Sequence, residues 1–178
     1  AGFAMTFQLW LLSAVLGLAL AVILLIMRIS GRWDLAAPTM AYIYIFRGTP
    51  ILVQIFIIYY GLPQLEFVRD SIFWPILKEP FGCAIVALSL NTGAYLSEIF
   101  RGGVLGVDRG LTEAAAALGI SVRQRFIYIT SPIAIRLCLP AYSNDVVSLM
   151  KSTALASTIT LLDMMGIART IVAETYAP

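Results

Sequence analysis

Histidine is absent from the 178-residue sequence, and charged residues make up only 12% of it. The lack of histidine removes the commonest metal ligand and the side chain that most often acts as a general base near neutral pH. The low charge leaves too few polar side chains to cover a water-soluble domain, in which about a quarter of the residues are charged. Both absences argue against a soluble enzyme.

Cysteine and net charge are also scarce. The two cysteines, Cys83 and Cys138, lie within apolar runs, where small buried residues are expected, so we assign them no disulfide and no metal site. A net charge of +2 gives no reason to expect nucleic acid as a partner. The sequence also lacks a phosphate-binding loop of the Gly-x4-Gly-Lys-Ser/Thr type, so any ATP chemistry belongs to another chain.

Hydrophobic residues account for 60% of the chain, and its mean hydropathy is +0.90. They gather in four long runs, which predict membrane-spanning helices near residues 5–27, 35–63, 80–100 and 126–150. The first run has no charge and about 23 residues, so as a helix it reaches about 35 Å and can cross a hydrocarbon core of about 30 Å. The predicted fold class is an all-α transmembrane helical bundle that forms one domain over 1–178.

The second run is interrupted by Pro38 and again by Gly48-Thr49-Pro50. A break of this kind frees backbone carbonyls, which a membrane protein tolerates only where they are buried or line a cavity. We therefore expect the segment around residue 49 to lie inside the bundle.

Basic residues are distributed unevenly between the runs. Arg28 and Arg32 follow the first run, and four more basic residues lie between the third and fourth, at Arg101, Arg109, Arg123 and Arg125. The segment 66–79 holds only two basic residues, Arg69 and Lys78, and three acidic ones. Because positive charge favours the cytoplasmic side, the N-terminus is predicted to be external and the loop 101–125 cytoplasmic.

The loop between the third and fourth runs predicts a short displayed helix. Thr112 can cap its start, Glu113 suits the positive end of its dipole, and the alanines that follow favour a helix with little bulk. Gly119 is placed to end it, and Ser121 with Gln124 forms a capping-box pattern that starts a second helix. Such a helix can seat in a groove of a partner and transmit a rigid-body motion. An ordinary surface loop with one helical turn is the alternative.

Five charged residues lie within or at the edge of the apolar runs: Arg47, Glu98, Arg136, Asp145 and Lys151. A charge in the bilayer costs at least a few kcal/mol, so each is expected to face the bundle interior, a partner or water. An amino acid brings a carboxylate and an ammonium group, and Arg47 with Glu98 would complement both. The structural alternative is that Arg47 stabilises the helix break and that Glu98 pairs with Arg101 or Arg136.

The fourth run offers a second candidate lining for a solute pathway. Asp145 and Lys151 lie there, near Asn144 and Ser148. The third run adds three polar side chains, Asn91, Thr92 and Tyr95. Hydrogen bonding between helices explains these three equally well.

The loop resembles the motif of ABC importer permeases: Glu-Ala-Ala, three residues, Gly, nine residues, Ile, one residue, then a Leu-Pro pair. The sequence matches it at Glu113, Ala114, Ala115, Gly119, Ile129 and Pro132, and differs at Ser131, where the family usually has leucine. The stretches 46–54, 94–103 and 144–155 resemble the polar amino-acid branch of that family. In the last of them relatives tend to have Glu at position 145 and a second acid at 152.

The resemblance implies the membrane permease subunit of an ATP-binding-cassette importer, which forms the translocation pathway for a polar amino acid or a derivative. It implies a multi-pass protein of the bacterial inner membrane, paired with a second permease as a homodimer or a heterodimer. It also implies that an external solute-binding protein delivers the solute and that ATPase subunits bind ATP and Mg²⁺, so that this chain is not an enzyme. The coupling residues would be Thr112, Glu113, Ala114, Ala115, Leu118 and Gly119.

The family usually has five spans with an internal C-terminus. Since the sequence stops where a fifth span would begin, just past 174–176, we expect that span, and a short N-terminal stretch, to lie outside it. Three alternatives remain: a passive channel or structural membrane subunit, an importer permease for another small solute, and an intramembrane enzyme. A channel has no need of the helical loop 112–120, and an enzyme would need a nucleophile with a base or a metal site.

Overall fold

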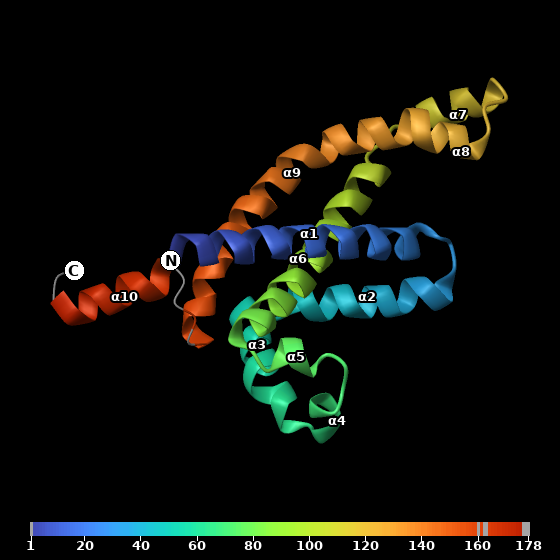
Figure 1. Cartoon of the computed structure of the whole chain (residues 1–178). Helices are drawn as coiled ribbons and strands as arrows, with labels where there is room; N and C mark the ends of the chain where they lie inside the picture. Colours follow the sequence, from blue (N-terminus) through green and yellow to red (C-terminus); the bar gives the residue numbers. More distant parts are fainter. Residues whose placement is uncertain (1, 160, 162–163, 176–178) are drawn as a thin grey trace.

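The computed structural model of the chain describes residues 2–159, 161 and 164–175, and within these ranges it contains helices and no strands. This confirms the predicted all-α fold class (Figure 1). The α-helices are α1 (Gly2–Ile29), α2 (Trp33–Gly48), α3 (Ile51–Phe56), α4 (Glu66–Arg69), α5 (Trp74–Leu77), α6 (Pro80–Leu105), α7 (Arg109–Ala117), α8 (Val122–Arg125), α9 (Ser131–Ser152) and α10 (Met164–Thr175). Short π- and 3-10 segments extend them at Ile57–Gly61, Leu62–Gln64, Phe126–Thr130 and Thr153–Ile159.

Three helical stretches in the described part are long and apolar enough to cross a membrane: Gly2–Ile29, Pro80–Leu105 and Val122–Ile159. They overlap the first, third and fourth apolar runs, and each extends beyond the run. The third helix continues to Leu105 and the fourth begins at Val122, so the loop between them is shorter than the predicted 101–125. After the fourth stretch, α10 has 12 residues and reaches about 18 Å, too short to cross a bilayer by itself.

The second run is divided into two helices that meet at an angle of 105°, α2 and the stretch Ile51–Gln64. The break lies at Thr49-Pro50, as expected, and Thr49 is extended, with φ −115° and ψ 143°, because a residue that precedes proline is disfavoured in the helical region. The expected interruption at Pro38 is wrong, because α2 continues through it.

α1 lies along α6, and small residues let the two backbones approach. Ser13 and Ala21 are fully buried, and a Cβ on Gly17 would come within 2.8 Å of the Thr92 side chain. The opposite side of α1 exposes large apolar side chains, among them Phe3, Val15 and Ile26. An apolar surface of this extent marks contact with lipid.

α6 also packs against α9, and Gly103 lies at this contact. A Cβ at this position would overlap the Cys138 sulfur and lie 2.8 Å from the carbonyl oxygen of Ala134. Gly102, one position earlier, has no atom within 4 Å of such a Cβ. The two glycines therefore differ in packing although they are neighbours in one helix.

We expect Gly103→Ala to destabilise the protein by about 1–3 kcal/mol, because the added methyl group overpacks the contact between α6 and α9. Thermal unfolding of the purified protein in lipid nanodiscs would measure the loss. Gly102→Ala is the matched control and should leave the unfolding temperature close to that of the wild type. Equal shifts for the two variants would contradict the close approach at Gly103.

Candidate polar cavity and coupling helix

The break between α2 and α3 is closed by the side chain of Gln54. Pro50 has no N–H, so the carbonyl of Phe46, four residues earlier, lacks its helical donor. The Gln54 amide nitrogen donates to the Phe46 oxygen at 2.8 Å, to the Thr49 carbonyl at 3.0 Å and to the Thr49 hydroxyl at 2.8 Å. Gln54 is only 6% exposed, and its amide group bonds to the backbone carbonyls that the break leaves open. Residues 47–50 are themselves exposed in the chain, so the expectation that this segment lies inside the bundle is not met within the chain.

Asn91 fastens the same break to α6. Its amide nitrogen donates to the Phe46 carbonyl at 3.2 Å and to the Gln54 side-chain oxygen at 3.1 Å. The Thr49 hydroxyl in turn donates to the carbonyl of Ile45 at 2.8 Å. The bent segment is thus held at a fixed place against the third membrane-spanning helix.

A cavity of about 240 Å³ lies beside this break, between α2–α3, α6 and α9. It brings together five of the residues singled out from the sequence: Asn91, Thr92, Tyr95, Asp145 and Ser148. Its other lining residues are Thr49, Pro50, Ile51, Leu88, Leu149 and Ser152. Asp145 is the only charged residue in this lining, and no salt bridge to it is present in the described part of the chain.

The other candidate pathway residues do not line this cavity. Asn144 and Lys151 are exposed on other faces of α9, because side chains one residue before and six residues after Asp145 point elsewhere on a helix. Arg47 lies next to the cavity rather than in it, with its guanidinium carbon 5.2 Å from the ring centre of Tyr95.

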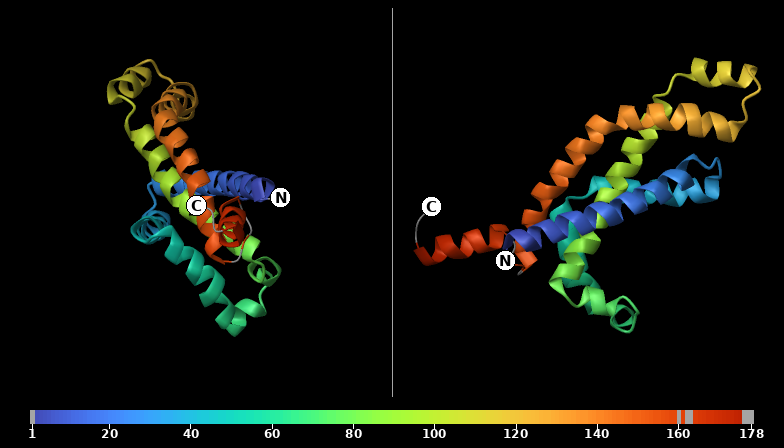
Figure 2. Two further views of the ribbon diagram at one scale, coloured as in Figure 1. Left: turned by 90° about the vertical axis from the view of Figure 1, so that its left-hand side faces the viewer. Right: turned by 45° about the horizontal axis from the view of Figure 1, so that its top comes forward.

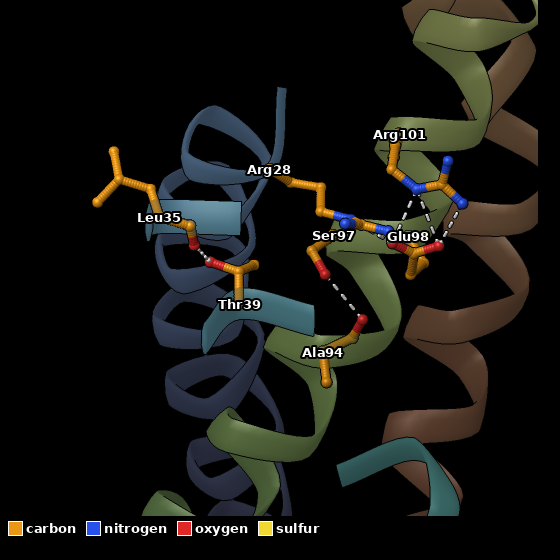
Figure 3. A network of polar contacts seen from close by, with 7 residues as sticks. All are labelled: Arg28, Leu35, Thr39, Ala94, Ser97, Glu98 and Arg101. Carbon is orange, nitrogen blue, oxygen red and sulfur yellow. Dashed lines mark hydrogen bonds and ion pairs between the residues drawn. The ribbon is translucent and has the colours of Figure 1, made fainter. Parts of the chain in front are cut away.

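Glu98 lies in a separate small pocket of about 80 Å³. It accepts hydrogen bonds from Arg101 at 2.6 and 2.8 Å, and it lies 3.9 Å from the Nε of Arg28 (Figure 3). The pairing of Glu98 with Arg101 agrees with the structural alternative. Of the two partners offered by that alternative, Arg101 is the one that pairs, and Arg136 is exposed on α9 with no ion pair to Glu98 in the described part of the chain.

The short helix α7 projects beyond the bundle, beside α8 and at the far end of the rod that continues into α9 (Figures 1 and 2). The Asp108 side chain caps it by accepting from the N–H of Gly110 at 2.7 Å. The predicted cap at Thr112 is therefore wrong. Thr112 lies inside the helix, where its hydroxyl donates to the Arg109 carbonyl at 2.8 Å, and Glu113 lies in the second turn.

The end of α7 and the start of α8 agree with the sequence patterns. Gly119 has φ +76°, which favours glycine, and its N–H donates to Ala116 while that of Ile120 donates to Ala115. Ser121 and Gln124 form the predicted capping box.

One side of α7 packs against α8, and the other side is exposed. Ala115 is 4% exposed, and the Arg125 side chain donates to the Thr112 carbonyl at 3.2 Å, which ties α7 to α8. Leu118 is 81% exposed at the outer tip, and Glu113 and Ala114 are also exposed. The helix is held from one side and free on the other.

Long apolar helices, a polar cavity at a broken helix and a displayed terminal helix together define a membrane transport protein. Over residues 13–177 the chain matches the family described as "Binding-protein-dependent transport system inner membrane component", and it belongs to that family. It is a transport permease rather than an enzyme, and a membrane protein.

Similar proteins agree with this assignment. The octopine transport system permease of Rhizobium meliloti is 51% identical over 100% of this chain and 73% of its own length. The nopaline permease of Agrobacterium fabrum is 45% identical over 97% of this chain and 72% of its own length. The histidine/lysine/arginine/ornithine permease of Escherichia coli K12 is 43% identical over 99% of this chain and 75% of its own length. The chain thus spans about three-quarters of the length of these relatives.

Solved structures show the same architecture. A crystal structure of an amino acid ABC transporter with histidines matches with a TM-score of 0.87 and 33% identity, over 99% of this chain and 78% of that one. An inward-facing methionine ABC transporter matches with a TM-score of 0.69 at 21% identity, over 98% of this chain and 78% of that one. At this identity the match shows the fold alone. The chain is therefore a permease of the amino-acid ABC importer type.

Residues that matter to the site were missed by sequence reasoning. Gln54 lies in the stretch 46–54, which resembles the polar amino-acid branch of the family, but it was assigned no role from the sequence. It is the one polar side chain in α3, Ile51–Phe56, and that isolation was the available signal. Arg28 was used only to orient the chain, although its side chain lines the pocket of Glu98.

Proposed function

We propose that this chain forms the translocation pathway for a polar amino acid or amino-acid derivative that carries a positive charge. The observation that supports it is the cavity at the broken helix, in which the carboxylate of Asp145 is surrounded by the amide and hydroxyl groups of Asn91, Thr92, Tyr95 and Ser148. A carboxylate without a cationic partner inside a membrane protein is costly. An ammonium or guanidinium group of the solute supplies that partner.

The relatives support a cationic solute. One of them is named for histidine, lysine, arginine and ornithine, and others are named for octopine and nopaline. The first four are amino acids with basic side chains. A cavity with one carboxylate and several neutral hydrogen-bonding groups suits such a solute better than an acidic one.

We also propose the assembly in which the pathway operates. A second permease, a homologue or a copy of this chain, completes the pathway, and an external binding protein delivers the solute. The N-terminus is external and α7 is cytoplasmic, where ATPase subunits that bind ATP and Mg²⁺ receive it. Glu113, Ala114 and Leu118 form the docking face, while Thr112, Ala115 and Gly119 hold the shape of the helix.

The test is Asp145→Asn in the complete importer, reconstituted in proteoliposomes with its binding protein. We expect uptake of radiolabelled L-arginine to fall at least tenfold, because the amide cannot balance the charge of the solute. Asp70→Asn makes the same chemical change at an exposed position between α4 and α5 and should leave uptake unchanged. Wild-type uptake by the Asp145→Asn importer would refute the proposal.

A further inference from the structure

The small pocket beside the cavity holds an excess of positive charge. Arg28 reaches it from α1, Arg47 from α2 and Arg101 from α6, whereas Glu98 is the one acid among its lining residues. Met40, Ile43 and Tyr44 of α2 complete the wall. Three guanidinium groups therefore face one carboxylate in a volume of about 80 Å³ (Figure 3 shows Arg28, Glu98 and Arg101).

Glu98 is hydrogen-bonded to Arg101 and forms only a long ion pair with Arg28, so it does not supply the hydrogen-bond acceptors of the other two arginines. Both of its oxygens accept from Arg101, at 2.6–3.0 Å. Arg28 is beyond hydrogen-bond distance, at 3.9 Å, and its Nε is buried without an acceptor in the described part of the chain. The guanidinium carbon of Arg47 lies over the Tyr95 ring, 5.2 Å from its centre, and among the described residues no carboxylate lies within salt-bridge distance of Arg47.

The Nε of Arg28 is buried without a hydrogen-bond acceptor among the described residues, and the exposed Arg47 has no carboxylate within salt-bridge distance, so both side chains can donate to an anion. A buried donor without an acceptor costs about 1–3 kcal/mol, and more when the group is charged. Arginine binds planar oxyanions such as carboxylates and phosphates well, because its N–H groups form a fork. The pocket therefore has the chemistry of an anion site.

The pocket adjoins the solute cavity through Tyr95. This side chain lines the cavity, and its ring lies under Arg47, which lines the pocket. On α6 the residues Asn91, Tyr95 and Glu98 are spaced by four and three positions, so they follow one face of the helix from the cavity to the pocket.

We propose that this pocket, through Arg28 and Arg47, binds the carboxylate of the transported solute while the cationic group of the solute lies near Asp145. The proposal rests on the function proposed above and adds the second end of the solute. A volume of about 80 Å³ has room for a carboxylate group. A lipid phosphate has the same chemistry and is the competing source of the anion.

The test measures binding of radiolabelled L-arginine, and of agmatine, which lacks the carboxylate. The complete importer is placed in phosphatidylcholine nanodiscs without ATP. We expect Arg28→Gln to raise the Kd of L-arginine about tenfold and to change that of agmatine less than twofold, because only arginine has the group that the pocket binds. Arg28→Lys should fall between, since lysine keeps the charge but not the fork. The control Arg32→Gln removes an exposed arginine four residues away and should change neither Kd.

The outcomes separate this proposal from the preceding one. Asp145→Asn should weaken both ligands, and its failure to do so would refute the cation site alone. An Arg28→Gln importer with equal losses for both ligands, or with none, would refute the carboxylate site alone. In a third possible result, phosphatidylglycerol raises the unfolding temperature of the wild type but not of Arg28→Gln, and Arg28→Gln leaves arginine binding unaffected. This result would assign the pocket to a lipid phosphate and would overturn the assignment to the solute.

Discussion

An importer that carries Gln54→Leu is expected to lose almost all transport, to below about a tenth of the wild-type rate. Leucine has nearly the size of glutamine but none of its hydrogen-bonding groups. It would leave the Thr49 carbonyl without its side-chain donor and would remove one of the two acceptors of Asn91. Each buried group left unsatisfied costs about 1–3 kcal/mol, so we expect the bend to lose its fixed position. The wall of the cavity would then move away from Asp145.

Solute uptake by proteoliposomes measures this loss, and thermal unfolding in nanodiscs shows whether the rest of the bundle survives. Gln64→Leu makes the same change on an exposed glutamine, which bonds only to the nearby Tyr60 carbonyl, and should transport normally. Gln54→Glu keeps the acceptor and removes the two amide donors, so it should fail like the leucine variant. Normal uptake by both Gln54 variants would show that the bend does not position the cavity.

The spans and the helix ends could be predicted because their causes are local. A long run of apolar residues needs lipid wherever it lies in the fold, and Pro50 removes a helical donor whatever surrounds it. The same holds for Gly119, whose positive φ follows from the end of a helix, and for the capping box at Ser121 and Gln124. None of these features depends on a distant segment.

The start of α7 shows how a local prediction fails. The sequence-based prediction named only Thr112, which lies next to Glu113 and the alanines, although Asp108 is also an acceptable cap residue. Asp108 is the cap because the helix can include Arg109 and Gly110 as well, which adds backbone hydrogen bonds before the alanines begin. The competing cap was visible in the sequence, but the choice between the two was not.

The membership of the cavity could be predicted only in part, since it depends on how helices cross. Asp145 and Ser148 are three apart on α9, and Asn91 and Tyr95 are four apart on α6, so each pair lies on one face of its helix and both pairs line the cavity. The face of α9 that turns toward α6 includes the close contact at Gly103, which gives no polar signal in the sequence. Asn144 lies outside this cavity, and its place in the pathway stays a prediction.

Substitution of Leu118 by glutamate is expected to uncouple the importer from ATP. Leu118 is 81% exposed at the tip of α7, so the change should not disturb the fold of the permease. Burying a leucine in the groove of a partner contributes about 1.5–3 kcal/mol, and a glutamate there would have to lose its hydration instead. We expect ATP-driven uptake to fall by at least tenfold, and the ATPase subunits to separate from the permease during purification.

Val122→Glu is the matched control, because Val122 is 73% exposed at the start of α8 and lies outside the proposed docking face. It should keep both ATP-driven uptake and the ATPase subunits. Full coupling in the Leu118→Glu importer would contradict the assignment of α7 as the docking helix. Uptake that continues without ATP and is unchanged by both substitutions would contradict the importer function itself. The cavity would then serve a passive pathway.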